Sequence, residues 1–352
     1  MRVLLTGAAG FIGGHILEAL EAAGHEVVAI DAMLDSAHGR NPQLPDGITQ
    51  VDVRDVSSVT TLLGGVDVVC HQAAVVGAGV DAGDAPAYAI HNDFGTAVLL
   101  AAMHETGCRR MVLASSMVVY GEGRYRNAED EVVVPAPRRR DDLDAGIFDH
   151  LDPASGAPLV WDLVDEDAAP NPRSLYAASK LAQENYALAW SLSTGGSVAA
   201  LRYHNVYGAR MPRGTPYSGV AAMFRSALEA GQPPRVFEDG RQARDFVHVH
   251  DVAAANVLAV ESDRPGFEPF NVCSALPITI GEVAALLAAE CRGPRPVLTG
   301  QYRPGDVRHI VASPTKAAEM LGFRARITPH EGLRGFATMP LREAESFGAP
   351  HV

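Results

Sequence analysis

Short apolar runs alternate with helically spaced apolar residues along the first third of the chain. The run RVLLTG, residues 2–7, ends at a glycine, and residues 8–31 continue with helical spacing, a break at Gly24 and a second apolar run. Strand, glycine turn, helix and strand in this order are typical of a βαβ unit. The amino-terminal end of the chain therefore predicts the start of a parallel sheet.

The same alternation continues as far as residue 116. Residues 48–55 and 66–77 each indicate a strand followed by a loop, a helix is expected near residues 86–106, and residues 109–116 form a further strand. This order predicts an α/β fold, a Rossmann-type doubly wound parallel sheet with a smaller carboxyl-terminal α/β substrate-binding region. Ligands of such sheets bind at the carboxyl ends of the strands.

The first turn carries a glycine pattern that suits a dinucleotide. Gly7, Gly10 and Gly13 lie between the first strand and the first helix, where missing Cβ atoms permit a tight turn and let a pyrophosphate approach backbone N–H groups. Asp31 ends the next apolar run, where its carboxylate can accept hydrogen bonds from an adenosine ribose and would repel a 2′-phosphate. The pattern therefore predicts NAD rather than NADP.

Composition and charge restrict the partners. The 352 residues include 42 acidic and 29 basic side chains, giving a net charge of −13, and no basic run could follow a nucleic acid. An anionic small molecule can still bind where a few arginines gather in one cleft. The cysteines show no Cys-x-x-Cys spacing, and the chain shows neither a cleavable signal nor a membrane-length apolar run. We expect a cytoplasmic protein with free thiols, no membrane contact and no metal site.

Tyr176 and Lys180 in SLYAASK are four positions apart, so on a helix both can face one pocket. A free tyrosine, with a pKa near 10, is a poor base at neutral pH. An ammonium about 4 Å from the phenol contributes roughly 4 kcal/mol, or about three pKa units before desolvation is subtracted. The pair therefore predicts a tyrosine that can remove a proton from a hydroxyl group.

Several segments, in this order, resemble the extended short-chain dehydrogenase/reductase family, and specifically its nucleotide-sugar epimerases and dehydratases. The segments are TGAAGFIGG, DVRD, HQAA, HNDFGT, LASSMVVYG, YAASK, RYHNVYG, YSGVAAMF and ARDFVHVHDV. The resemblance covers nearly the whole chain. It implies an enzyme that binds NAD and a nucleotide-diphosphate sugar.

The resemblance also implies roles for individual residues. The active site would consist of Ser116, Tyr176 and Lys180. The residues that bind substrate would be Ser116, Asn205, Arg244, Arg303 and Asp306. The residues that bind the cofactor would be Gly7, Gly10, Phe11, Ile12, Gly13, Asp31, Asp52, Val53, Gln72, Ala73, Ala74, Asn92, Tyr176, Lys180, Tyr203 and Val206.

Met117 and Val118 follow the serine and carry no acid or base. In 4,6-dehydratases of the family the matching positions hold an aspartate and a glutamate, and related decarboxylases carry a glutamate beside the serine or threonine. We therefore expect an NAD-dependent epimerase that interconverts nucleotide-activated hexoses at C4 through a transient 4-keto sugar and NADH. The alternatives are a 4-ketoreductase or dehydrogenase, a 4,6-dehydratase or decarboxylase, and a non-catalytic dinucleotide sensor.

Ser116 and Tyr176 are 60 positions apart, whereas a couple of dozen residues separate them in most relatives. The additional residues, about 122–172, are polar and loop-like, as in many active-site lids. Arg138 to Arg140 within them could contact a substrate phosphate, although a solvated position is commoner for arginines in such a loop.

This insert resembles that of a bacterial subgroup that includes dTDP-L-rhamnose 4-epimerase-like proteins. The cysteines of a small metal knuckle expected in that subgroup are replaced here by Asn127, Asp152 and Ser155. No zinc knuckle can form, so the resemblance leaves two substrates open, UDP-glucose or UDP-galactose and a dTDP-6-deoxyhexose.

The motif positions divide the chain in two. We expect residues 1–203 to form the NAD-binding Rossmann domain, with the insert at about 122–172, and residues 204–352 to form mainly the substrate-binding domain. Some later segments should return to the Rossmann core. The family resemblance further implies a homodimer through helices that include the one carrying Tyr176, where QENYALAWSL offers apolar residues.

Overall fold

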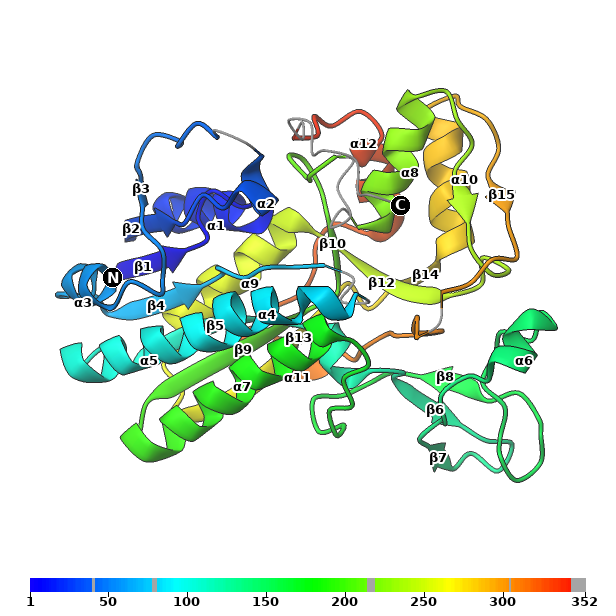
Figure 1. Cartoon of the computed structure of the whole chain (residues 1–352), viewed down its shortest axis with the longest axis horizontal. Helices are drawn as coiled ribbons and strands as arrows, with labels where there is room; N and C mark the ends of the chain where they lie inside the picture. Colours follow the sequence, from blue (N-terminus) through cyan, green and yellow to red (C-terminus); the bar gives the residue numbers. More distant parts are fainter. Residues whose placement is uncertain (40–41, 78–80, 214–218, 304, 343–352) are drawn as a thin grey trace.

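A seven-stranded sheet, parallel throughout, organises the molecule. The computed structural model describes residues 1–39, 42–77, 81–213, 219–303 and 305–342 (Figure 1). The strand order is β13-β9-β5-β4-β1-β2-β3, so the chain starts near the middle of the sheet and winds outward in both directions. Its strands are β1 (Arg2–Thr6), β2 (Glu26–Asp31), β3 (Ile48–Gln50), β4 (Val68–His71), β5 (Arg110–Ser116), β9 (Ser197–Tyr203) and β13 (Gly266–Val272).

Helices cover both faces of this sheet (Figure 1). One face packs against α1 (Phe11–Ala22), α9 (Val249–Glu261) and α11 (Thr315–Leu321). The other packs against α3 (Val56–Leu62), α5 (Gly95–Thr106) and α7 (Leu175–Thr194). Because the strands are buried on both sides, they read as continuous apolar runs rather than as alternating ones. The predicted doubly wound fold is confirmed.

The helix expected near residues 86–106 is present but changes character along its length. It begins as α4 (Ala85–Tyr88), passes through a π-helical segment, η2 (Ala89–Phe94), and continues as α5. The π turn contains Asn92, which is completely buried. Such turns occur mostly at functional sites. Two short elements lie nearby in the chain, α2 (Asp35–His38) and η1 (Ala82–Asp84).

A smaller α/β region packs beside the carboxyl ends of the main strands. It contains the three-stranded sheet β10-β12-β14 and the pair β11-β15. The strands are β10 (Asn205–Tyr207), β11 (Arg235–Val236), β12 (Ala243–His248), β14 (Pro277–Thr279) and β15 (Val297–Leu298). The helices are α8 (Val220–Glu229), α10 (Ile280–Glu290) and α12 (Pro329–Phe336), which share one apolar core. The chain between these elements returns to the main sheet as α9, β13 and α11.

The long insert between Ser116 and Tyr176 forms a layer of its own (Figure 1, lower right). It follows the short helix η3 (Met117–Tyr120) and contains the antiparallel sheet β7-β6-β8 and one short helix. These elements are β6 (Arg124–Arg126), β7 (Val132–Val133), β8 (Val160–Asp162) and α6 (Arg140–Asp144).

The two ends of the insert meet at the main body. The N–H group of Asn171 donates to the carbonyl of Val119 at 2.8 Å. Gly121 has a φ of +65°, and a Cβ atom there would lie 2.1 Å from the carbonyl oxygen of Asn171. Only glycine fits this crossing. The closed crossing lets Ser116 and Tyr176 come together despite the residues between them.

The loop that replaces the expected metal knuckle is closed by hydrogen bonds. The Asp152 carboxylate accepts from the Ser155 hydroxyl at 2.6 Å and from the N–H of Ala154 at 3.1 Å. In the part of the chain that the structure describes, no group of three or more His, Cys, Asp or Glu residues could hold a metal ion. The four cysteines are free thiols. None of the described helices is both long enough and apolar enough to cross a membrane.

Candidate active site

The glycine turn between β1 and α1 leaves backbone exposed where side chains would otherwise stand. Gly7 has a φ of +70°, and a Cβ atom on it would lie 2.7 Å from the backbone nitrogen of Ala73. A Cβ atom on Gly13 would lie 2.0 Å from the carbonyl oxygen of Gly7. The turn therefore packs against two neighbouring segments and presents N–H groups at the start of α1, which is the arrangement a pyrophosphate requires.

A cavity opens beside this turn at the carboxyl ends of β1, β2 and β4. The predicted cofactor residues in its wall are Gly7, Gly10, Asp31, Asp52, Val53, Gln72, Ala73 and Ala74. The other predicted cofactor residues are not part of its described wall, namely Phe11, Ile12, Gly13, Asn92, Tyr176, Lys180, Tyr203 and Val206. The residues present fit a dinucleotide, because the glycines leave room for the phosphates and Asp31 stands at the end of β2.

Asp31 is ionised in this setting. Burial alone would raise the pKa of the carboxyl group, but a hydrogen bond with His38 and one from the N–H of Met33 outweigh it and lower that pKa. The same carboxylate accepts from the N–H of Ala9 in the glycine turn at 3.0 Å. A negative charge fixed here suits a ribose with free hydroxyls and disfavours a 2′-phosphate.

Asn92, one of the predicted cofactor residues, holds Val75 in the wall of the cavity in place. The Asn92 side chain accepts from the N–H of Val75 at 2.7 Å and donates to the carbonyl of Val75 at 2.9 Å. It also donates to the hydroxyl of Ser179 on α7 at 2.9 Å. Asn92 therefore joins the π turn, the loop after β4 and the helix that carries Tyr176.

The predicted catalytic residues meet at the carboxyl end of β5. Ser116 ends β5, and a side-chain hydrogen bond links its hydroxyl to Tyr176, the second residue of α7. The ammonium group of Lys180 donates to the carbonyl of Ala114, two residues before Ser116, at 2.8 Å. Helix α7 thus presents both side chains to the same strand end, as their spacing predicts.

Electrostatics in this cluster differ from the sequence-based expectation. Burial raises the pKa of Tyr176, and the hydrogen bond with Ser116 opposes this shift. The charge of Lys180 does not contribute to the pKa shift of the Tyr176 phenol, although the sequence predicted that it would lower this pKa. Burial also lowers the pKa of Lys180 to about 8, while Glu184 and Asp93 oppose this shift. The physical reason is that removal from water dominates over pairwise attraction for both groups.

The predicted substrate residues lie on separate segments of the smaller region. Arg244 is on β12, and its guanidinium group donates to the carbonyls of Val307 and Arg308 at 2.6 and 2.9 Å. Arg303 is exposed, with its guanidinium carbon 5.0 Å from the ring centre of Phe237. Arg303 is thus the more accessible of the two predicted phosphate-binding arginines.

Asp306 and Asn205 complete the predicted substrate set. Burial raises the pKa of Asp306, and the charges of Arg303, Arg244 and Arg138 oppose that shift, so four ionisable groups gather here. The side-chain oxygen of Asn205 is buried without a hydrogen-bond partner in the described part of the chain. An unpartnered buried acceptor is costly, which is consistent with a ligand at this position.

Sequence reasoning missed two features of the site. Neither ring nitrogen of His204 has a hydrogen-bond partner among the described residues, although the side chain is 4% exposed and lies beside Asn205. Arg138 was expected in solvent or on a phosphate, but its side chain is 5% exposed and pairs with Glu238. The sequence gives no signal for the unpartnered His204 ring or for the buried pair of Arg138 and Glu238, because both depend on how distant segments pack.

Comparison with known proteins agrees with this geometry. The chain matches the model of the family described as "NAD dependent epimerase/dehydratase family" over residues 3–140 and 156–273. It is 31% identical to the dTDP-L-rhamnose 4-epimerase of Burkholderia thailandensis, covering 98% of this chain and 96% of the relative. It is also 31% identical to the UDP-glucose 4-epimerase of Mycolicibacterium smegmatis, covering 95% and 96%.

The UDP-glucose 4-epimerase of Thermus thermophilus, solved in complex with NAD, superimposes with a TM-score of 0.74 at 30% identity. The match covers 96% of this chain and 98% of that one. The gap between the two ranges that the family model matches, residues 141–155, lies inside the insert. Because the model spans most of the chain and runs through both the glycine turn and α7, the chain belongs to the NAD dependent epimerase/dehydratase family, as its motifs predicted.

Proposed function

We propose that this protein is an NAD-dependent epimerase that inverts C4 of the hexose in a nucleotide-diphosphate sugar, either a UDP-hexose or a dTDP-hexose. The observation that carries the proposal is the cluster of Ser116, Tyr176 and Lys180 at the carboxyl end of β5, on the same edge of the parallel sheet as the glycine turn, with no acid or base at Met117 or Val118. Such a cluster supports oxidation and reduction at one carbon and lacks the acid that would eliminate water.

The residues of this chain divide the work at C4. NAD, when bound, supplies the acceptor for the C4 hydride. The phenolic oxygen of Tyr176 takes the proton of the C4 hydroxyl, and the Ser116 hydroxyl holds the same substrate oxygen by a hydrogen bond. The ammonium group of Lys180 donates to the carbonyl of Ala114, two residues before Ser116, and would hydrogen-bond a ribose hydroxyl of the bound cofactor. For the inversion, Tyr176 would return the proton to the C4 oxygen once the 4-keto sugar has presented its opposite face, so that the reduced cofactor would be consumed again and no net cofactor used.

The smaller region supplies the anion-binding groups. Arg303 is exposed beside Phe237. Arg244 on β12 donates to the carbonyl of Val307, four residues after Arg303. Arginine can bind diphosphate oxygens through two parallel hydrogen bonds, so these two side chains suit a nucleotide diphosphate. The relatives whose names specify dTDP-L-rhamnose and UDP-glucose support both nucleotides equally.

The test is a panel of UDP-, dTDP- and GDP-hexoses incubated with the NAD-loaded protein. We expect interconversion of C4 epimers, seen by NMR of the sugar, with no net formation of NADH. Stoichiometric NADH with a released keto sugar would instead identify a dehydrogenase. Tyr176→Phe should retain NAD and lose at least about a hundredfold in turnover. Unchanged turnover would remove Tyr176 from the mechanism.

We further propose a cytoplasmic homodimer that binds no nucleic acid. Helix α7 exposes Tyr186, Leu188 and Leu192, with 49%, 39% and 79% of their surface accessible. Phe94 in the neighbouring π turn is 55% exposed. Apolar side chains gathered on adjoining helices suit a second copy of the chain. A monomeric mass in solution scattering would contradict this proposal.

A further inference from the structure

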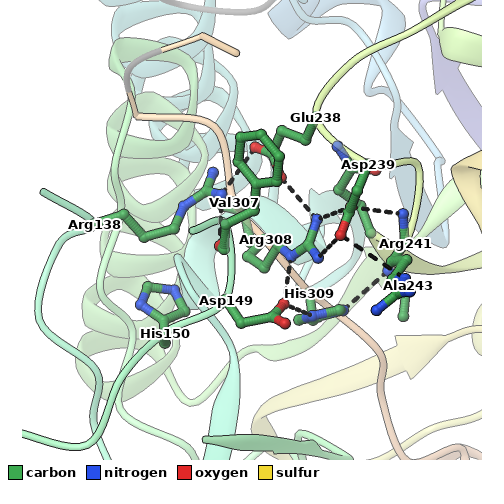
Figure 2. A network of polar contacts seen from close by, with 12 residues as sticks. Arg138, Asp149, His150, Glu238, Asp239, Arg241, Ala243, Val307, Arg308 and His309 are labelled. Atoms are coloured by element: carbon green, nitrogen blue, oxygen red, sulfur yellow. Dashed lines mark hydrogen bonds and ion pairs between the residues drawn. The ribbon is translucent and has the colours of Figure 1, made fainter. Parts of the chain in front are cut away.

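Three side chains link the insert to residues 301–308, here called the Arg303 segment. The hydroxyl of Tyr302 donates to the carboxylate of Asp144 in α6 at 2.6 Å. The guanidinium Nε of Arg308 donates to the carboxylate of Asp149 at 2.7 Å. Between these contacts, Arg138 reaches the segment from the insert side, near Val307 and Glu238 (Figure 2). Its guanidinium group donates to the carbonyl of Asp306.

Arg138 makes the central contact. Its side chain donates to the carboxylate of Glu238 at 2.8 Å, to the carbonyl of Phe148 at 3.0 Å and to the carbonyl of Asp306 at 2.6 Å. These three acceptors come from the loop before β12, the insert and the Arg303 segment. One buried guanidinium group therefore ties three parts of the chain together.

Glu238 links Arg138 to the start of the Arg303 segment. Its backbone has a φ of +52°, which is uncommon for a residue with a side chain, and its N–H donates to the carbonyl of Gln301 at 2.7 Å. Its second carboxylate oxygen accepts from Arg308 at 2.8 Å. Arg138 and Arg308 thus hold the carboxylate of Glu238 from both sides, and its backbone holds the start of the Arg303 segment.

The segment held in this way carries the exposed arginine of the predicted substrate site. The backbone N–H of Asp306 donates to the carbonyl of Arg303 at 3.1 Å, closing a turn whose far end is the carbonyl bound by Arg138. An open cavity of about 480 Å³ lies between α6 and this turn, lined by Leu143 and Asp144 on one side and by Phe237 and Arg303 on the other. The insert therefore both forms a wall of this cavity and fixes the opposite wall.

We propose that Arg138 is a positioning residue for nucleotide-diphosphate binding, and that the insert acts on substrate affinity through it. This rests on the proposed function, in which Arg303 contacts the diphosphate. Arg138 holds the carbonyl of Asp306 and the carboxylate of Glu238, so the turn presents Arg303 in one orientation before the substrate arrives. A preorganised cation binds an anion more tightly than a mobile one does, because less conformational freedom is lost on binding.

The test compares binding of UDP and dTDP by calorimetry in the NAD-loaded protein and in matched variants. Arg138→Met removes all three hydrogen bonds, and Arg138→Lys keeps a charge near Glu238 but cannot contact all three acceptors. Arg139→Met is the control, because this neighbouring side chain is 74% exposed and its nearest carboxylate oxygen is 3.7 Å away. Both Arg138 variants should weaken nucleotide binding about tenfold or more, whereas the control should bind like the unmodified protein.

Steady-state kinetics separates positioning from general damage. Both Arg138 variants should raise KM for the converted sugar nucleotide about tenfold while kcat and NAD content stay within about twofold. A fall in kcat with unchanged KM would overturn the proposal. If Arg138→Met does not fold, Arg138→Lys decides alone.

The outcomes also separate this inference from the proposed function. If the unmodified protein binds neither UDP nor dTDP, the substrate class itself is wrong. If it binds them and Arg303→Met weakens binding while the Arg138 variants do not, Arg303 is correctly placed and the positioning role of Arg138 is wrong.

Discussion

Two buried cations of this protein have opposite surroundings. Lys180 is 3% exposed, and its ammonium group donates to a single carbonyl, that of Ala114. Arg308 is fully buried and bonds to the carboxylates of Asp149, Glu238 and Asp239 at 2.7 to 2.9 Å (Figure 2). Burial lowers the pKa of Lys180 to about 8, whereas the bonds to Asp239 and Asp149 overcome burial and raise the pKa of Arg308.

The difference separates a charge held for chemistry from a charge used for structure. The charge of Arg308 is neutralised within the protein, so removing it takes a shared cation away from three carboxylates. The charge of Lys180 is compensated by no carboxylate within ion-pair distance in the described part of the chain. Its burial costs stability, and this cost is explained if the charge acts on the bound cofactor.

Replacement of Arg308 should have the largest effect. Arg308→Met leaves three acidic side chains without their shared partner and should lower the free energy of unfolding by about 3–5 kcal/mol. Urea unfolding measures this change. Arg241→Met is the matched control, because Arg241 is 79% exposed and approaches the same Asp239 only at 3.9 Å. Equal effects from both substitutions would contradict the structural role of Arg308.

Replacement of Lys180 should affect turnover rather than stability. Lys180→Met should reduce turnover by about a hundredfold or more, while the free energy of unfolding at neutral pH stays equal or rises, because a desolvated charge is removed. Lys316 is the only other lysine of the chain and serves as the control, since it forms a partly exposed ion pair with Glu268. A Lys180 variant with normal turnover and a lowered free energy of unfolding would show that Lys180 has a structural role instead of a catalytic one.

The pH dependence of stability should give the smallest effect. In the unfolded chain Lys180 keeps its proton up to pH 10.5, and in the folded protein it loses it above about pH 8. Between these values the unfolded state binds more protons, so this group makes stability rise with pH. From pH 7.5 to 9.5 the unmodified protein should gain about 2 kcal/mol relative to Lys180→Met. If the free energies of unfolding of the two proteins change equally with pH, the pKa of Lys180 is not lowered.

The sequence predicted the parts of the site that depend on local geometry. The glycine turn, the end of β2 at Asp31 and the spacing of Tyr176 and Lys180 each follow from a few neighbouring residues. The sheet and its helices followed from apolar periodicity. Such signals are readable because strand and helix periods are fixed by backbone geometry.

The insert could not be predicted in the same way. Its sequence is polar and lacks a period, and its side chains pair with Arg308, Glu238 and other residues far along the chain. Arg138 and Glu238 are 100 positions apart, and no local rule pairs them. The pKa of Tyr176 was also misjudged, because the sequence gives the distance to a charge but not the loss of water around the phenol.

The crossing of Gly121 and Asn171 has a consequence for how this enzyme can change. The chain leaves the main body and re-enters it at one point, so the entropy of closing the excursion depends only weakly on its length. Residues between the two ends that do not contact the rest of the chain can be lengthened, shortened or exchanged without displacing the reacting side chains, whereas Arg138 and Asp149 are needed for their contacts with Glu238 and Arg308. The crossing is therefore a point at which the insert can be exchanged between relatives as one unit, provided that these contacts are kept, while Ser116 and Tyr176 stay in place.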